Sequence, residues 1–89
     1  MDSAQARDHS DQIRELIAEQ LHVSIDAVDP TRQLIEDLGA DLLSLAELAL
    51  ALEDVFDIDI PDEEWIDMES VSQVVAYVSS LIDAKQARH

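Results

Sequence analysis

The chain has 89 residues, of which 21 are aspartate or glutamate and only 5 are lysine or arginine, so its formal net charge at pH 7 is −16. A surface this acidic repels nucleic acid and anionic lipid, whereas it attracts basic proteins and divalent cations. Cysteine is absent, which excludes disulfides and a thiol nucleophile. No apolar run approaches the ~18 residues of a membrane span, so we expect a cytoplasmic protein. The length corresponds to one small domain, which we expect to be a monomer.

The N-terminal residues 1–9 are polar and are predicted to form a disordered extension. They lack the apolar core of a signal peptide, so we expect no secretion signal. A first helix is predicted to begin at about residue 10, where Ser10 or Asp11 can serve as its N-cap. Its apolar residues follow the i, i+3, i+4, i+8 spacing of one helix face: Ile13, Leu16, Ile17 and Leu21.

A long connection is predicted over residues 23–40. Asp29 and Pro30 mark a break in it, because proline disfavours helix in the residue before it. The segment is apolar at several positions, so we expect it to pack against the rest of the domain instead of behaving as a free linker. These apolar positions are Val23, Ile25, Val28, Leu34 and Leu38.

A second helix is predicted over residues 41–56, with Asp41 as its N-cap. At 100° per residue, its apolar residues divide between two faces. The face predicted to lie in the core contains Leu45, Leu48, Ala49, Leu52, Val55 and Phe56. The opposite face contains Leu42, Leu43, Ala46 and Leu50, among the acids Glu47, Glu53, Asp54 and Asp57. An exposed apolar strip ringed by acids is typical of a surface that docks on a partner protein; the alternative is a helix buried on nearly all sides.

The last third of the chain contains two further helical segments. Pro61 precedes a short piece predicted over residues 62–67, and Ser70 and Gln73 have the spacing of a capping box at the start of a final helix. Residues 84–89 are predicted to form a frayed tail. The predicted fold is therefore all-α, with three longer helices, one short helix and a long first loop within residues 10–83. The apolar face of the final helix consists of Val71, Val74, Val75, Val78, Leu81 and Ile82.

Catalytic and metal sites find little support in the sequence. A calcium-binding EF-hand loop beginning at Asp57 fails, because Pro61 and Asp62 occupy its fifth and sixth positions and Met68 replaces its terminal glutamate. Only loose, weak binding of divalent cations along residues 53–64 is expected. The chain has no glycine-rich phosphate loop, so we expect no enzyme activity. Metal-ligand spacing is also lacking between its histidines, His9, His22 and His89.

Residues 36–64, EDLGADLLSLAELALALEDVFDIDIPDEE, closely resemble the central segment of discrete bacterial acyl carrier proteins. The flanking helices fit as well, so the resemblance covers roughly residues 10–83. It implies a right-handed helical bundle that carries acyl chains as thioesters on 4′-phosphopantetheine. Trp65, the only tryptophan, is predicted to fill the small core, or to border the groove in which a family member would hold its acyl chain.

Position 42 departs from the family pattern. The family attaches phosphopantetheine to the serine of an Asp-Ser-Leu motif, and this chain has Asp41-Leu42-Leu43. Leucine offers no hydroxyl, so we expect no phosphopantetheine on the chain as written. Ser44 is the nearest hydroxyl, but two residues turn a helix by 200°, which directs Ser44 toward the core side. We expect Ser44 to bond backbone groups of the first turn instead.

Leu42 has two explanations, and both stay open. It is either an engineered Ser→Leu change that keeps a carrier unmodified, or the natural residue of a paralogue that docks on partners without cargo. We favour the engineered change, because the residues around position 42 still fit a working carrier.

The resemblance implies a role in fatty-acid or polyketide-type biosynthesis. The acidic second helix would dock on basic surfaces of synthase enzymes, among them a ketosynthase, a reductase or dehydratase, and acyl- and phosphopantetheinyl-transferases. An acidic mimic of DNA is disfavoured, because the acids crowd around one apolar strip and are not spaced like phosphates. The residues expected to dock are Asp41, Leu43, Ala46, Glu47, Leu50, Glu53 and Asp54.

Overall fold

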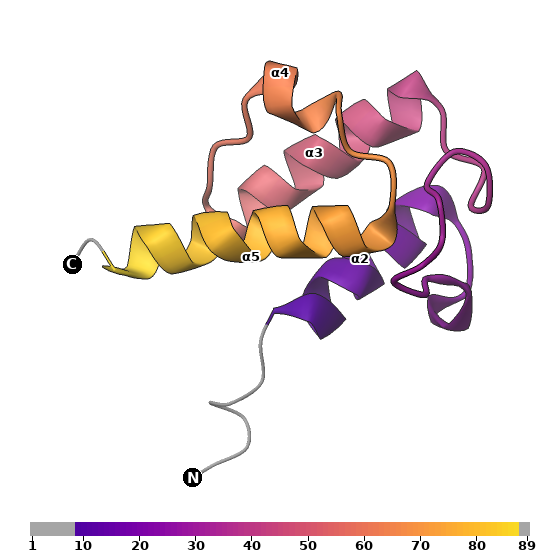
Figure 1. Ribbon diagram of the computed structural model, residues 1–89, viewed down its shortest axis with the longest axis horizontal. Helices are drawn as coiled ribbons and strands as arrows, with labels where there is room; N and C mark the ends of the chain where they lie inside the picture. Colours follow the sequence, from indigo (N-terminus) through magenta and orange to yellow (C-terminus); the bar gives the residue numbers. More distant parts are fainter. Residues whose placement is uncertain (1–8, 88–89) are drawn as a thin grey trace, which may run out of the picture.

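The computed structural model describes residues 9–87. Its helices follow the order α2 (Ser10–Leu21), the 3-10 helix η1 (Ile25–Ala27), α3 (Leu42–Phe56), α4 (Asp62–Trp65) and α5 (Val71–Ala87). The prediction of an all-α fold with three longer helices, one short helix and a long first loop is confirmed. In Figure 1, α5 crosses the middle of the domain, with α2 below it and α3 and α4 above it. Within residues 9–87 no helix is long and apolar enough to cross a membrane.

Helix α2 packs one apolar face into the core. Ile13 and Ile17 are fully buried and their neighbours Leu16 and Leu21 are half-buried, as the spacing predicts. The predicted N-cap, Ser10 or Asp11, is wrong. The helix begins at Ser10, so His9 is its N-cap, and the His9 side chain forms no capping bond. The predicted extension over residues 1–8 lies outside the described residues.

The connection between α2 and α3 packs against the domain, as expected. Val28 and Leu34 are fully buried, and Arg14 Nε of α2 donates a hydrogen bond to the Val28 carbonyl at 2.7 Å. Ile25 is the exception to the expected packing: it lies in η1, a helix that the sequence analysis does not predict, and is 39% exposed. The Leu34 N–H donates to the Glu69 carbonyl at 2.8 Å, which joins the connection to the segment before α5.

Helix α3 confirms most of the predicted core face. Leu48 and Leu52 are fully buried, whereas the apolar residues beside them are half-buried. Val55 does not lie in the core as predicted, since it is 53% exposed. It sits at the edge of the apolar face, where Leu16 and Glu19 of α2 leave a shallow hollow open beside it.

Helix α5 begins with the predicted capping box. The Ser70 N–H donates to Gln73 Oε1 at 2.9 Å, and the Gln73 N–H donates to Ser70 Oγ at 3.3 Å. The helix continues to Ala87, so residues 84–87 are helical and not the frayed tail expected there. Lys85 lies in this last stretch of α5, where its Nζ donates to the Asp57 carbonyl at 2.7 Å and also bonds the Asp57 carboxylate. The Lys85 ammonium lowers the pKa of that carboxyl group.

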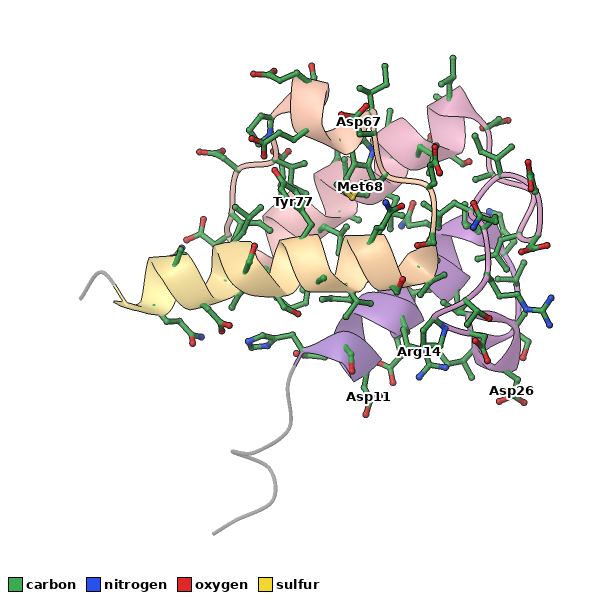
Figure 2. The ribbon with its side chains drawn as sticks, in the orientation of Figure 1. Asp11, Arg14, Asp26, Asp67, Met68 and Tyr77 are labelled. Atoms are coloured by element: carbon green, nitrogen blue, oxygen red, sulfur yellow. The ribbon has the colours of Figure 1, made fainter. Side chains whose placement is uncertain are left out.

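Helix α4 is held by a side-chain bond on each side. Trp65 Nε1 donates to the Leu45 carbonyl of α3 at 3.0 Å, and the Tyr77 hydroxyl of α5 donates to the Glu64 carboxylate at 2.5 Å. Figure 2 shows Tyr77 extending from α5 toward α4. Burial, the largest cause, acts together with the hydrogen bond and negative charge of Glu64 and the charge of Glu63 to raise the pKa of Tyr77 to about 12.

We therefore expect the phenol of Tyr77, the only tyrosine, to titrate near pH 12 in the folded protein. Its contribution to stability is fully present below the unfolded pKa of about 10 and is lost as the pH rises through the folded value. Glu64→Gln should lower the midpoint only part of the way, because burial, the largest cause, remains. A pH titration that follows phenolate absorbance and helicity together measures the Tyr77 midpoint and the loss of the folded structure.

Glu63→Gln is the matched control, since Glu63 acts on Tyr77 by charge alone. It should lower the Tyr77 midpoint less than Glu64→Gln does. Equal midpoints in both variants and the parent chain would contradict a role for the Tyr77–Glu64 bond.

Candidate functional site

The start of α3 is fixed by a reciprocal pair of capping bonds. Asp41 is the N-cap, and its Oδ1 accepts a hydrogen bond from the Ser44 N–H at 2.8 Å. Ser44 Oγ accepts from the Asp41 N–H at 2.9 Å and donates to the Asp41 carbonyl at 3.1 Å. The Ser44 N–H, and then its hydroxyl, hold the pKa of the Asp41 carboxyl group below its ordinary value. Both predictions, Asp41 as the N-cap and Ser44 as a partner of first-turn backbone groups, are confirmed.

Leu42 lies at the first position of α3 and is 79% exposed. Gly39 shapes the approach to it: its φ of 76° is left-handed, a conformation that side-chain-bearing residues rarely adopt. Ala40 turns back into the core between them. The side chain at position 42 is therefore exposed to solvent at the N-terminus of a capped helix.

The outer face of α3 forms an exposed apolar strip, which we define as Leu42, Leu43, Ala46 and Leu50. Leu43 is 68% exposed and Leu50 is 65% exposed, and Ala46 is exposed between them. The predicted exposure of the strip is confirmed, and the alternative of a helix buried on nearly all sides is wrong.

The acids expected to accompany this strip differ in their surroundings. Glu47 and Asp54 are exposed, and among the described residues neither forms an ion pair. Glu53 is half-buried, and its Oε2 accepts a hydrogen bond from the Ile60 N–H at 2.8 Å. Glu53 therefore holds the segment between α3 and α4 in place, a structural task that the sequence analysis does not predict.

An apolar groove of about 760 Å³ runs beside the strip, between α3, α4 and the connection near residue 35. Trp65 is only 9% exposed, so the expectation that it fills the core is confirmed, and it also lies in the wall of this groove. Leu42, Ala46 and Leu50 of the strip also line the groove, whereas Leu43 does not.

Two groove residues escape the sequence analysis. Ile35 is 56% exposed and Ile66 is 74% exposed, and both line the groove. Each follows a buried apolar neighbour, Leu34 or Trp65, in a turn or at a helix end. A pair of consecutive apolar residues in a turn or at a helix end is the sequence signal that could have predicted this exposure, because two consecutive side chains there do not both reach the core.

The described residues do not assemble a metal site. Across residues 9–87, no three His, Asp or Glu side chains are grouped so that they could hold an ion together.

The fold and the exposed start of α3 agree with a carrier domain, a small helical bundle whose second long helix begins at an accessible residue. The family described as "Phosphopantetheine attachment site" matches residues 11–78. Acyl carrier proteins of Campylobacter fetus subsp. fetus and Akkermansia muciniphila are each 45% identical over 71 residues, which cover 80% of this chain and 92% and 89% of the relatives. The acyl carrier protein of Wolinella succinogenes is 44% identical over 70 residues. The chain belongs to the acyl carrier protein family.

The residues at the start of α3 do not fit the phosphopantetheine group that the family implies. Covalent attachment needs a nucleophilic side-chain atom, and Leu42 carries only carbon and hydrogen. The Ser44 hydroxyl is engaged with Asp41 as both donor and acceptor. The chain therefore has the scaffold of a carrier, and the first turn of α3 offers no hydroxyl that is free of the capping bonds.

Proposed function

We propose that this carrier-family chain docks on enzymes of fatty-acid or polyketide-type synthesis through the outer face of α3, and that it carries no phosphopantetheine at position 42. The observation that carries the proposal is the exposed apolar strip beside the exposed carboxylates of Glu47 and Asp54. Apolar contact surrounded by charge supports docking on partners with basic rims. Ketosynthases, reductases or dehydratases, and acyl- and phosphopantetheinyl-transferases are the candidates.

In this proposal the chain takes part in binding and performs no catalysis. The loss of the attachment hydroxyl gives it one of two roles. It is a working carrier held in its unmodified form by a Ser→Leu change at Leu42, or it is a natural cargo-less protein that regulates synthase enzymes by occupying their carrier sites. The exposure of Leu42 supports both, and the genomic sequence of the source organism at this position distinguishes them.

The docking proposal predicts a charge-dependent association rate. Glu47→Lys should slow association with an immobilised ketosynthase of the same organism by roughly three- to tenfold at low salt, because it reverses a charge on the docking face. The difference should shrink as salt screens the charges. Surface plasmon resonance across a salt series measures both effects. Leu43→Asp should weaken the same complex without unfolding the helix.

Asp26→Lys is the matched control. Asp26 is an exposed acid of η1 and lies away from α3 in Figure 2, so the variant has the same net charge as Glu47→Lys. It should associate nearly as fast as the parent chain. If both variants slowed association equally, the association rate would depend only on net charge, and the proposal that α3 is the docking surface would be contradicted. Glu53 is a poor choice for this test because of its bond to Ile60.

A further inference from the structure

We propose that Met68 is an oxidation-sensitive site, at which an uncharged peroxide converts the thioether to a sulfoxide and thereby loosens α4 from α3. Met68 carries the only sulfur atom of residues 9–87, because the chain has no cysteine and its other methionine is Met1. The proposal concerns the chemistry of this side chain and does not depend on the proposed docking function.

The Met68 side chain lies at the wall of an open groove. Met68 is half-buried and lines the groove of about 760 Å³ beside α3. Figure 2 shows its side chain, with the sulfur atom, between α4 and α5. Because susceptibility to oxidation follows exposure, a peroxide small enough to follow water into the groove reaches the sulfur while the domain stays folded.

The charge around the groove selects the oxidant. The acids Glu36, Glu53, Asp62 and Glu69 line the groove, and none of the described lysine, arginine or histidine residues does. These carboxylates repel anionic oxidants, whereas hydrogen peroxide and alkyl hydroperoxides carry no charge near neutral pH.

The oxidation needs no reactant besides the peroxide. The sulfur lone pair of Met68 attacks one peroxide oxygen, the O–O bond breaks and an S–O bond forms. The proton on the transferred oxygen passes to the departing oxygen. Sulfur therefore loses two electrons, the peroxide is reduced, and water or an alcohol leaves.

The sulfoxide would disturb the packing that holds α4. Met68 packs against the apolar core, and its N–H donates to the Trp65 carbonyl at 3.0 Å in the turn that follows α4. Helix α4 has only four residues, too few for a helix that is stable alone. Its position therefore depends on apolar contacts and on the side-chain bonds of Trp65 and Glu64. A sulfoxide replaces the apolar thioether with a polar, chiral group, and burial of its oxygen without a donor is unfavourable.

The test treats the folded chain with hydrogen peroxide and follows it by intact mass and peptide mapping. We expect Met68 to gain one oxygen atom at no less than roughly a tenth of the rate in the urea-unfolded chain, since the groove admits the reagent. The oxidised chain should melt roughly 5–15 °C lower than the parent chain. The emission of Trp65, the only tryptophan, should move to longer wavelength as the indole loses its apolar surroundings. Methionine sulfoxide reductases that act on both epimers should reverse both changes.

Met68→Leu is the matched control, because it keeps an apolar side chain of similar volume and leaves Met1 as the only methionine. Peroxide should change neither the melting temperature nor the Trp65 emission of this variant, which separates the effect of Met68 from any effect of Met1. Oxidation of Met68 below the stated rate would overturn the proposal. So would a Met68 sulfoxide with the melting temperature and emission of the parent chain, or equal effects of peroxide on the parent chain and on Met68→Leu.

Discussion

Replacing Leu42 by serine is expected to convert a chain that phosphopantetheinyl transferases leave unmodified into one that gains a single phosphopantetheine group. The parent chain lacks a free hydroxyl at the start of α3, because Leu42 has none and the Ser44 hydroxyl is bonded to Asp41. A serine at position 42 would be exposed, as Leu42 is at 79%. Intact mass after co-expression with a broad-specificity transferase measures the change, from no addition to complete addition.

The fold should tolerate this substitution. An exposed position outside the capping bonds is expected to change the free energy of unfolding by no more than about 0.5 kcal/mol. Ser44→Ala in the Leu42→Ser background is the control for position, and it should keep the added group. Addition to the parent chain at Ser44 would contradict the geometric argument. A folded Leu42→Ser protein that stays unmodified would favour the natural cargo-less protein over an engineered carrier.

The largest expected effect on stability comes from Leu52→Ala. Leu52 is fully buried between the helices, so the substitution removes buried methylene groups and leaves a cavity that costs about 3 kcal/mol. A domain of this size has a total stability of roughly 5–15 kcal/mol, and its melting temperature should fall by roughly 10–20 °C. Thermal and urea unfolding followed by circular dichroism measure the loss.

Leu50→Ala is the matched control, since it makes the same chemical change two residues earlier on the same helix. Leu50 is 65% exposed, so its truncation should change the free energy of unfolding by no more than about 0.5 kcal/mol. A comparable loss from both variants would mean that Leu50 is buried in solution, and the two-faced description of α3 would be wrong.

The sequence predicts the helices well where local rules decide the structure. Asp41 at the start of α3 and Ser70 with Gln73 at the start of α5 are confirmed because a cap depends only on residues within one turn. The fully buried Leu48 and Leu52 follow from periodicity alone.

The failures lie where distant segments decide the structure. Val55 has the right spacing for the core, yet it is 53% exposed beside a shallow hollow between α2 and α3. The contact of Lys85, near the end of α5, with Asp57 joins residues that are far apart in sequence. The family resemblance predicts a groove but not its exposed walls at Ile35 and Ile66. Each of these residues follows a buried apolar residue, and the fold of the chain at that point decides which of the two faces the groove. These features depend on tertiary contacts, which the periodicity of apolar residues does not predict.

The capping bonds at the start of α3 join Asp41 and Ser44 across position 42 without using its side chain. The stability of the fold is thereby separated from the chemistry at this position, which can change without a structural penalty that selection would remove. A serine codon and a leucine codon can differ by one nucleotide. Under the proposed function, a single mutation at this position would therefore decide whether the chain offers a hydroxyl for cargo attachment.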